Sequence, residues 1–132
     1  MTTLDRALVE QPGAVALAIA RCRMLIGVLG LLRTRRLLDR ALRHPLAPSD
    51  EAVAGLRMIA SRDLALGLGA ELAARRGPSA LRGWVEAGSL VDATDVVSLG
   101  RARTLRPLVR WGGALLAAVG AVLGNRVARN LT

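Results

Sequence analysis

The sequence predicts an all-α protein, and three observations lead to that prediction. No run of β-branched or aromatic residues alternates with period two, so strand patterns are absent. Breaks rich in proline, glycine and arginine divide the chain of 132 residues. The stretches between these breaks number four, and each has the length of a helix. Short connections between such helices favour an up-down four-helix bundle that fills the single domain 1–132, and we expect this bundle to be transmembrane.

The first helix is expected over about residues 13–32, and a run of arginines follows it. The loop HPLAPSD, His44 to Asp50, then contains two prolines. Ser49 is the expected N-cap of a second helix over about 51–75, because its hydroxyl can accept a hydrogen bond from the first turn and acidic residues follow it.

The segment RRGPS, which ends at Ser79, places a glycine stop, a proline and a second serine cap before a third helix over about 79–100. The basic segment GRARTLRP separates this helix from a fourth over about 107–127.

The composition lies between that of a soluble and that of a membrane protein. Hydrophobic residues make up 52% of the chain and charged residues 22%, with a mean hydropathy of +0.38. The fourth helix comes nearest to a membrane span, because the residues between Arg110 and Arg126 are uncharged. The first helix is long enough, but it contains Arg21 and Arg23, and an arginine at the centre of a span costs about 2.5–3.5 kcal/mol. Arg21 fits no inward face and is the strongest argument against four spans.

Three features favour the membrane nevertheless. Charges collect at the helix ends, and Trp84 and Trp111 lie near helix starts, where interfacial tryptophan is common. The fourth helix also carries a stripe of small residues, which allows helices to approach closely in lipid or allows two copies to form a homo-oligomer. The stripe consists of Gly113, Ala117, Gly120 and Gly124. We therefore expect a multi-pass protein of the cell (inner) membrane whose partner is membrane lipid.

The positive-inside rule gives an expected orientation for such a protein. With four spans, nine arginines lie in the first and third connections and six lie on the other side. Arginine-rich loops stay in the cytoplasm, so both termini are expected outside it.

Charged residues also interrupt the small-residue faces of three helices. Arg23, Asp63 and Asp92 each lie near mid-helix on such a face, and Asp95 shares the face of Asp92. Small-residue faces pack inward, and a buried charge is tolerated only when it is paired. Arg62 and Asp63 point about 100° apart on the helix, so they are poorly placed to pair with each other. We predict that the partner of Asp63 comes from another helix, with Arg23 as the first choice.

This cluster is the candidate site. Asp63, Asp92 and Asp95 are the candidate acids or bases, because a carboxyl group in an apolar interior can hold or relay a proton. The candidate ligand-binding residues on the same helices are Arg23, Arg62, Arg57 and Glu71. Arg57 and Glu71 share a face but lie about four turns apart, too far to pair directly. The competing interpretation is that these charges only fix the register of the helices.

The sequence predicts no cofactor and no metal site. A single Cys22, expected as a small buried residue, excludes an internal disulfide framework and a cysteine-based metal cluster. His44 has no second ligand near it, and no strand precedes the glycine-rich segments, so they are not phosphate-binding loops.

One stretch resembles a known group of proteins. The residues RMIASRDLALGLGAELAARRG, from Arg57, and RGWVEAGSLVDATDVVSL, up to Leu99, resemble small four-helix membrane proteins common in actinobacteria. These form domain families of unknown function that share an Arg-Asp-Leu-x-Leu-Gly motif, matched here at Arg62, Asp63 and Gly67, and a later Asp-containing helix. The resemblance covers about a third of the chain, and it implies location and topology without an activity.

Three functions compete. The first is a small polytopic membrane protein with an accessory, subunit or lipid-contacting role. The second is a membrane-embedded isomerase or cyclase that acts on a lipophilic small molecule through Asp63, Asp92 or Asp95, which requires a cavity lined by those carboxylates. The third is a soluble arginine-rich protein that binds nucleic acid, suggested by the net charge of +9. It ranks last, because no helix carries a continuous basic face.

Overall fold

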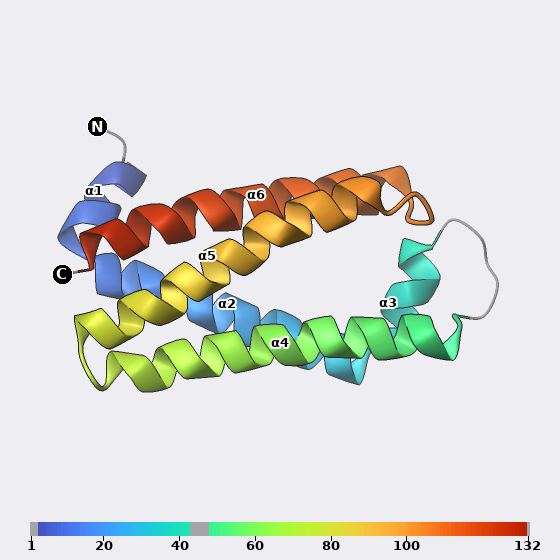
Figure 1. Cartoon of the computed structure of the whole chain (residues 1–132), viewed down its shortest axis with the longest axis horizontal. Helices are drawn as coiled ribbons and strands as arrows, with labels where there is room; N and C mark the ends of the chain where they lie inside the picture. The colour runs from blue at the N-terminus through green and yellow to red at the C-terminus, as the bar shows by residue number, and fades with distance from the viewer. Residues whose placement is uncertain (1–2, 43–47, 132) are drawn as a thin grey trace.

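The computed structural model describes residues 3–42 and 48–131, and every regular element in these two ranges is a helix (Figure 1). The prediction of an all-α chain is therefore confirmed. The helices are α1 (Thr3–Glu10), α2 (Pro12–Leu32), α3 (Thr34–Ala41), α4 (Asp50–Ala74), α5 (Pro78–Arg101) and α6 (Pro107–Asn130). The expected number of four was wrong, because the short helices α1 and α3 had not been predicted. Most of the expected loop from His44, including His44 itself, lies outside the described residues.

The chain turns sharply between α2 and α3. Arg33 leaves the helical conformation, with φ −123° and ψ 23°, and the hydroxyl of Thr34 donates a hydrogen bond to the carbonyl of Gly30 at 2.6 Å. Leu38 is buried, while the arginines beside it are exposed. The basic run expected to be a loop is thus a short amphipathic helix.

The helix starts follow from capping residues. The hydroxyl of Ser49 accepts a hydrogen bond from the N–H of Ala52 at 3.2 Å, as predicted. The second predicted cap, Ser79, is wrong. The N-cap of α5 is Gly77, whose φ of +116° suits glycine, and Pro78 occupies the first helical position.

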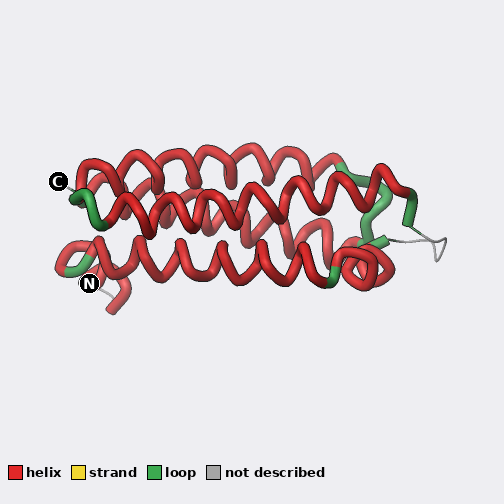
Figure 2. The backbone as a smooth tube through the Cα atoms, turned by 90° about the horizontal axis from the view of Figure 1, so that it is seen from below, coloured by secondary structure: helices red, strands yellow, loops and turns green. Residues whose placement is uncertain are grey.

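The four long helices lie lengthwise beside one another as two antiparallel pairs, α2 with α4 and α5 with α6 (Figures 1 and 2). Small residues make the close contact within the first pair. A Cβ atom added at Gly27 would lie 2.6 Å from the carbonyl oxygen of Ala60, and one at Gly67 would reach the backbone of Ala20. Close approach of this kind depends on residues without large side chains.

Helices α4 and α5 leave the same turn and separate towards their other ends (Figure 1). There α3 is attached to the connection between α5 and α6. Leu42 forms an isolated β-bridge with Leu105, and the backbone N–H of Arg106 donates to the carbonyl of Ala41 at 2.8 Å.

The apolar core lies at the opposite end of the molecule, near both termini. Its buried residues are Leu8, Ala16, Ala20, Ala70, Leu81, Val85, Val127, Ala128 and Leu131.

Candidate functional site

Five charged side chains form an alternating network in the middle of the molecule. A guanidinium nitrogen of Arg23 donates to Asp92 Oδ2, and its Nη1 lies 3.3 Å from Asp63 Oδ1. Arg62 Nη2 lies 3.6 Å from the same oxygen of Asp63 and 2.7 Å from Asp95 Oδ2. The order of charges is therefore carboxylate, guanidinium, carboxylate, guanidinium, carboxylate across α5, α2 and α4. The predicted pairing of Asp63 with Arg23 is confirmed.

The half of the network around Arg23 is largely enclosed. The side chains of Arg23, Asp63 and Asp92 are 13–14% exposed. Arg23 Nη2 also donates to the carbonyl oxygen of Gly88 at 3.1 Å, and Gly120 of α6 lies against the carboxylate of Asp92. The small residues next to these charges leave room for a guanidinium group between four helices.

The half around Arg62 is more open. Nη1 and Nη2 of Arg62 donate to the two oxygens of Asp95 at 3.1 and 2.7 Å, which is the bidentate geometry that strengthens such a pair. Its Nε is buried and has no hydrogen-bond partner in the part of the chain that the structure describes. Arg62 and Asp63, expected to be poorly placed to pair with each other, lie within ion-pair distance, although 3.6 Å is too long for a hydrogen bond.

The network contains one carboxylate more than it contains guanidinium groups. Asp92 and Asp95 each receive a short hydrogen bond from one arginine, whereas Asp63 shares both arginines at longer distances. Asp63 is therefore the least tightly held carboxylate of the network.

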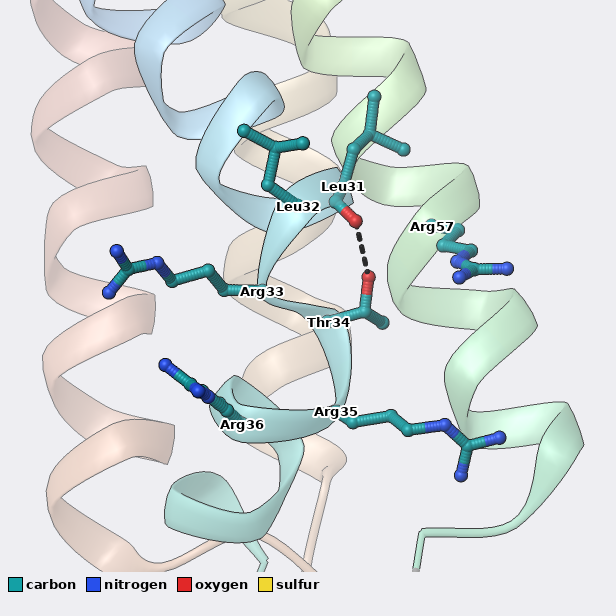
Figure 3. Close-up of a pocket in the computed structure, with 7 residues that line it drawn as sticks. All are labelled: Leu31, Leu32, Arg33, Thr34, Arg35, Arg36 and Arg57. Atoms are coloured by element: carbon teal, nitrogen blue, oxygen red, sulfur yellow. Dashed lines mark hydrogen bonds between the residues drawn. The ribbon is translucent and has the colours of Figure 1, made fainter.

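Two sequence-predicted site residues lie elsewhere. Arg57 lines a separate cavity of about 460 Å³ where α2 meets α3, together with Arg33, Thr34 and Arg35 (Figure 3). Figure 3 shows the arginines around this junction pointing in different directions rather than toward one centre.

Glu71 accepts a hydrogen bond from Arg21 Nε at 2.6 Å on the outer surface. The sequence did not predict this pair, because Arg21 fits no inward face of its helix and no partner was expected for it. The signal was available, because Arg21 and Glu71 come to the same depth once α2 and α4 are antiparallel.

The small-residue stripe of α6 packs within the chain. A Cβ atom at Gly113 would lie 3.1 Å from the side chain of Leu99, and one at Gly124 would lie 3.1 Å from Ser89. Gly120 faces Asp92 between them. Three residues of the Gly113–Gly124 stripe therefore pack against α5 within the chain, and a homo-oligomer through this stripe stays a prediction.

Other residues offer little chemistry. Cys22 is exposed, so the expectation of a buried residue was wrong. No group of three His, Cys, Asp or Glu side chains in the described ranges could hold a metal ion.

Comparison of the chain with protein-family models, with curated proteins and with solved structures finds no match. The resemblance to actinobacterial membrane proteins therefore stays a prediction.

Among the helices of the described ranges, two, α2 and α6, are long and apolar enough to cross a membrane by length and composition. In a soluble protein such helices form the core. Here only 22% of the apolar 18-residue stretch of α2 is buried, and only 11% of the corresponding stretch of α6.

Proposed function

We propose that this chain is a small multi-pass protein of the cell membrane, in which α2, α4, α5 and α6 form an up-down transmembrane bundle. Its role is that of an accessory factor, a subunit or a lipid-contacting protein. The observation that carries the proposal is the distribution of side chains: large apolar residues lie outside, whereas small residues and paired charges lie inside.

The outer surface is apolar to an extent that water would not favour. Large apolar side chains that are at least half exposed occur on all four long helices, and on α2 and α6 they include Leu25, Ile26, Leu32, Leu108, Leu115, Leu116 and Val122. The accessible surface of 8619 Å² also exceeds the roughly 6,700 Å² expected for a compact soluble monomer of this mass. Exposed apolar surface of this extent favours contact with lipid or with a partner.

The interior supports the same proposal. Most residues buried between the long helices are glycine or alanine, as in membrane proteins whose helices associate through close packing. The charges near the middle of α4 and α5, namely Arg62, Asp63, Asp92 and Asp95, point inward and are paired.

The two tryptophans lie towards the two ends of the bundle, where many of the exposed arginines also lie. Trp84 lies in the second turn of α5 and Trp111 in the second turn of α6, which are at opposite ends of this pair. The guanidinium of Arg110 lies 4.6 Å from the ring centroid of Trp111. Tryptophan beside arginine is typical of the membrane interface. This separation into two ends also gives no continuous basic face for nucleic acid among the described helices.

Membrane extraction tests the proposal. Membranes from cells that express the chain are washed with concentrated salt and then with alkaline carbonate. We expect the protein to stay in the pellet and to require detergent for release. Release by salt or carbonate would overturn the proposal.

A matched pair of variants makes the test specific. Leu116 is 74% exposed near the middle of α6, and Leu108 is 86% exposed at its start. Leu116→Asp should reduce integration, because a charge at the centre of a span costs about 2.5–3.5 kcal/mol, and Leu108→Asp should have little effect. A water-soluble protein would tolerate both variants equally.

A second candidate function is a membrane-embedded isomerase or cyclase, and one observation favours it. A mostly apolar cavity includes Asp95 in its wall. Asp63 and Asp92 do not line this cavity, so Asp95 is the acid or base that the candidate requires. The test is a search for isomerised or cyclised products after incubation of the purified protein with a lipid extract. Products that form with the natural chain and not with Asp95→Asn would support an enzyme.

A further inference from the structure

A cavity of about 690 Å³ lies between α3, the first half of α4, the end of α5 and the start of α6. We call it the α3 cavity. Its volume is within the range of roughly 300–1,000 Å³ that small-molecule sites occupy. Most of its wall is apolar, and the polar side chains in it are Arg40, Asp95, Ser98 and Thr104.

The fold explains why this space is open. Helices α4 and α5 separate as they leave their common turn, and the residues that α4 contributes at this level include Ala52 and Gly55. A Cβ atom added at Gly55 would have no neighbour within 4 Å. Helix α3 closes the wide end, because Leu42 and Arg106 tie it to the α5–α6 connection.

The two charged side chains in the wall of the α3 cavity, Asp95 and Arg40, differ in whether they have an ionic partner. Asp95 is already neutralised by the bidentate contact with Arg62. Arg40 is exposed and has no ion pair within the described residues. Three more arginines lie next in sequence to cavity-lining residues where α5 leads into α6, namely Arg101, Arg103 and Arg106. This side of the cavity therefore attracts an anionic group.

The rim shows how an apolar molecule reaches the space. Leu37, Ile59 and Val109 line the cavity and are 39%, 48% and 37% exposed. These side chains connect the cavity to the apolar outer surface, so a hydrocarbon chain enters without passing a charged group.

From this geometry we propose that the α3 cavity holds one acyl chain of an anionic membrane lipid, with the acid group at Arg40. The inference rests on the proposed membrane location, since the bilayer supplies the lipid. The chain buries apolar surface against α3, α4 and α5, and the guanidinium of Arg40 pairs with the acid group.

Photo-crosslinking in membranes tests the inference. The probe is a long-chain fatty acid with a diazirine near its methyl end, and the adducts are located by mass spectrometry of peptides. We expect adducts on the cavity walls, within residues 52–59 and 95–109, that are lost when unlabelled oleate is added in excess.

Two pairs of variants separate the cavity from general lipid contact. Gly55→Leu fills the cavity and should reduce its adducts about tenfold, whereas Gly83→Leu, at a helical glycine that is equally open but distant, should not reduce them. Arg40→Gln should weaken competition by oleate about tenfold and leave competition by methyl oleate unchanged. Arg36→Gln, on the same helix but outside the cavity wall, is the control for charge.

Adducts that are unaffected by Gly55→Leu, or a methyl ester that competes as well as the acid, would overturn the inference. Crosslinks from the cavity to a second copy of the chain would also overturn it, because a protein segment would then occupy the space. If carbonate releases the protein but the adduct pattern holds, the membrane proposal fails and the lipid site stands. If the protein resists carbonate but gives no cavity adducts, only the lipid site fails.

Discussion

Gly120 of α6 lies directly against the carboxylate of Asp92 in α5, and no space for a methyl group remains between them. Asp92 cannot easily move away, because Arg23 holds it. Gly120→Ala should therefore destabilise the protein. The crowding costs about 1–3 kcal/mol, which exceeds the roughly 0.5–1 kcal/mol that alanine gains over glycine within a helix. Thermal unfolding in detergent, followed by far-UV circular dichroism, measures the effect.

Gly112 provides the control for this substitution. It lies in the same helix, and a Cβ atom there would have no neighbour within 4 Å. Gly112→Ala should leave the unfolding temperature unchanged or raise it. Equal effects of the two substitutions would show that Asp92 is not held at Gly120.

The alternating network predicts unequal effects of removing its members. Arg23→Gln removes the arginine that holds Asp92 and leaves Asp63 with Arg62 alone, so it should lower the free energy of unfolding by about 3–5 kcal/mol. Asp63→Asn removes the excess carboxylate and leaves Arg23 bound to Asp92, so its cost should be much smaller. Chemical unfolding of the two variants in detergent gives the comparison. A larger loss for Asp63→Asn would contradict the assignment of Asp63 as the least tightly held carboxylate.

The Arg21–Glu71 pair on the outer surface behaves differently in lipid and in water. In a bilayer, Glu71→Leu leaves an unpaired guanidinium facing lipid, at a cost of about 2.5–3.5 kcal/mol, and a second change, Arg21→Leu, removes that cost. The double variant should therefore insert better than the Glu71 single variant. In water an exposed pair contributes about 0.2–1 kcal/mol, and neither change would matter much. The amount of each variant that resists carbonate extraction distinguishes the two cases.

The central contacts of the candidate site could be predicted from the sequence because they depend on helical periodicity. Arg23 and Asp63 each interrupt a stripe of small residues, and such stripes face inward on any packed helix. The helix ends were also predictable to within a few residues, since prolines and Ser49 mark them.

Other features could not be predicted in this way. Helix α3 has eight residues, too few for a periodic pattern to stand out in a basic run. The α3 cavity arises from the angle between α4 and α5 and from the contact of Leu42 with Leu105, and residue spacing contains neither. Arg62 reaches Asp63 because long guanidinium side chains bend, whereas a helical wheel fixes only the Cβ direction.

The orientation expected from the arginine counts gives a further prediction. Ser79 is exposed in the first turn of α5, and Thr104 is exposed in the connection that follows the other end of this helix. In a Cys22→Ser background, Ser79→Cys should react with a membrane-impermeant maleimide added to intact cells, because the arginine excess keeps the other end in the cytoplasm. Thr104→Cys should react only after the cells are opened. The reverse pattern would show the opposite orientation.

The most direct test of the membrane proposal uses the natural Cys22, which is exposed near the middle of α2. If α2 crosses the bilayer, this thiol faces hydrocarbon, away from the water in which the reaction with maleimide takes place. The test uses washed membranes from opened cells. We predict that N-ethylmaleimide labels Ser79→Cys and Thr104→Cys in the Cys22→Ser background. In the unsubstituted chain, we predict that it labels Cys22 only after denaturation. If N-ethylmaleimide labels Cys22 in those membranes as fast as it labels the two introduced cysteines, the result would contradict a transmembrane bundle.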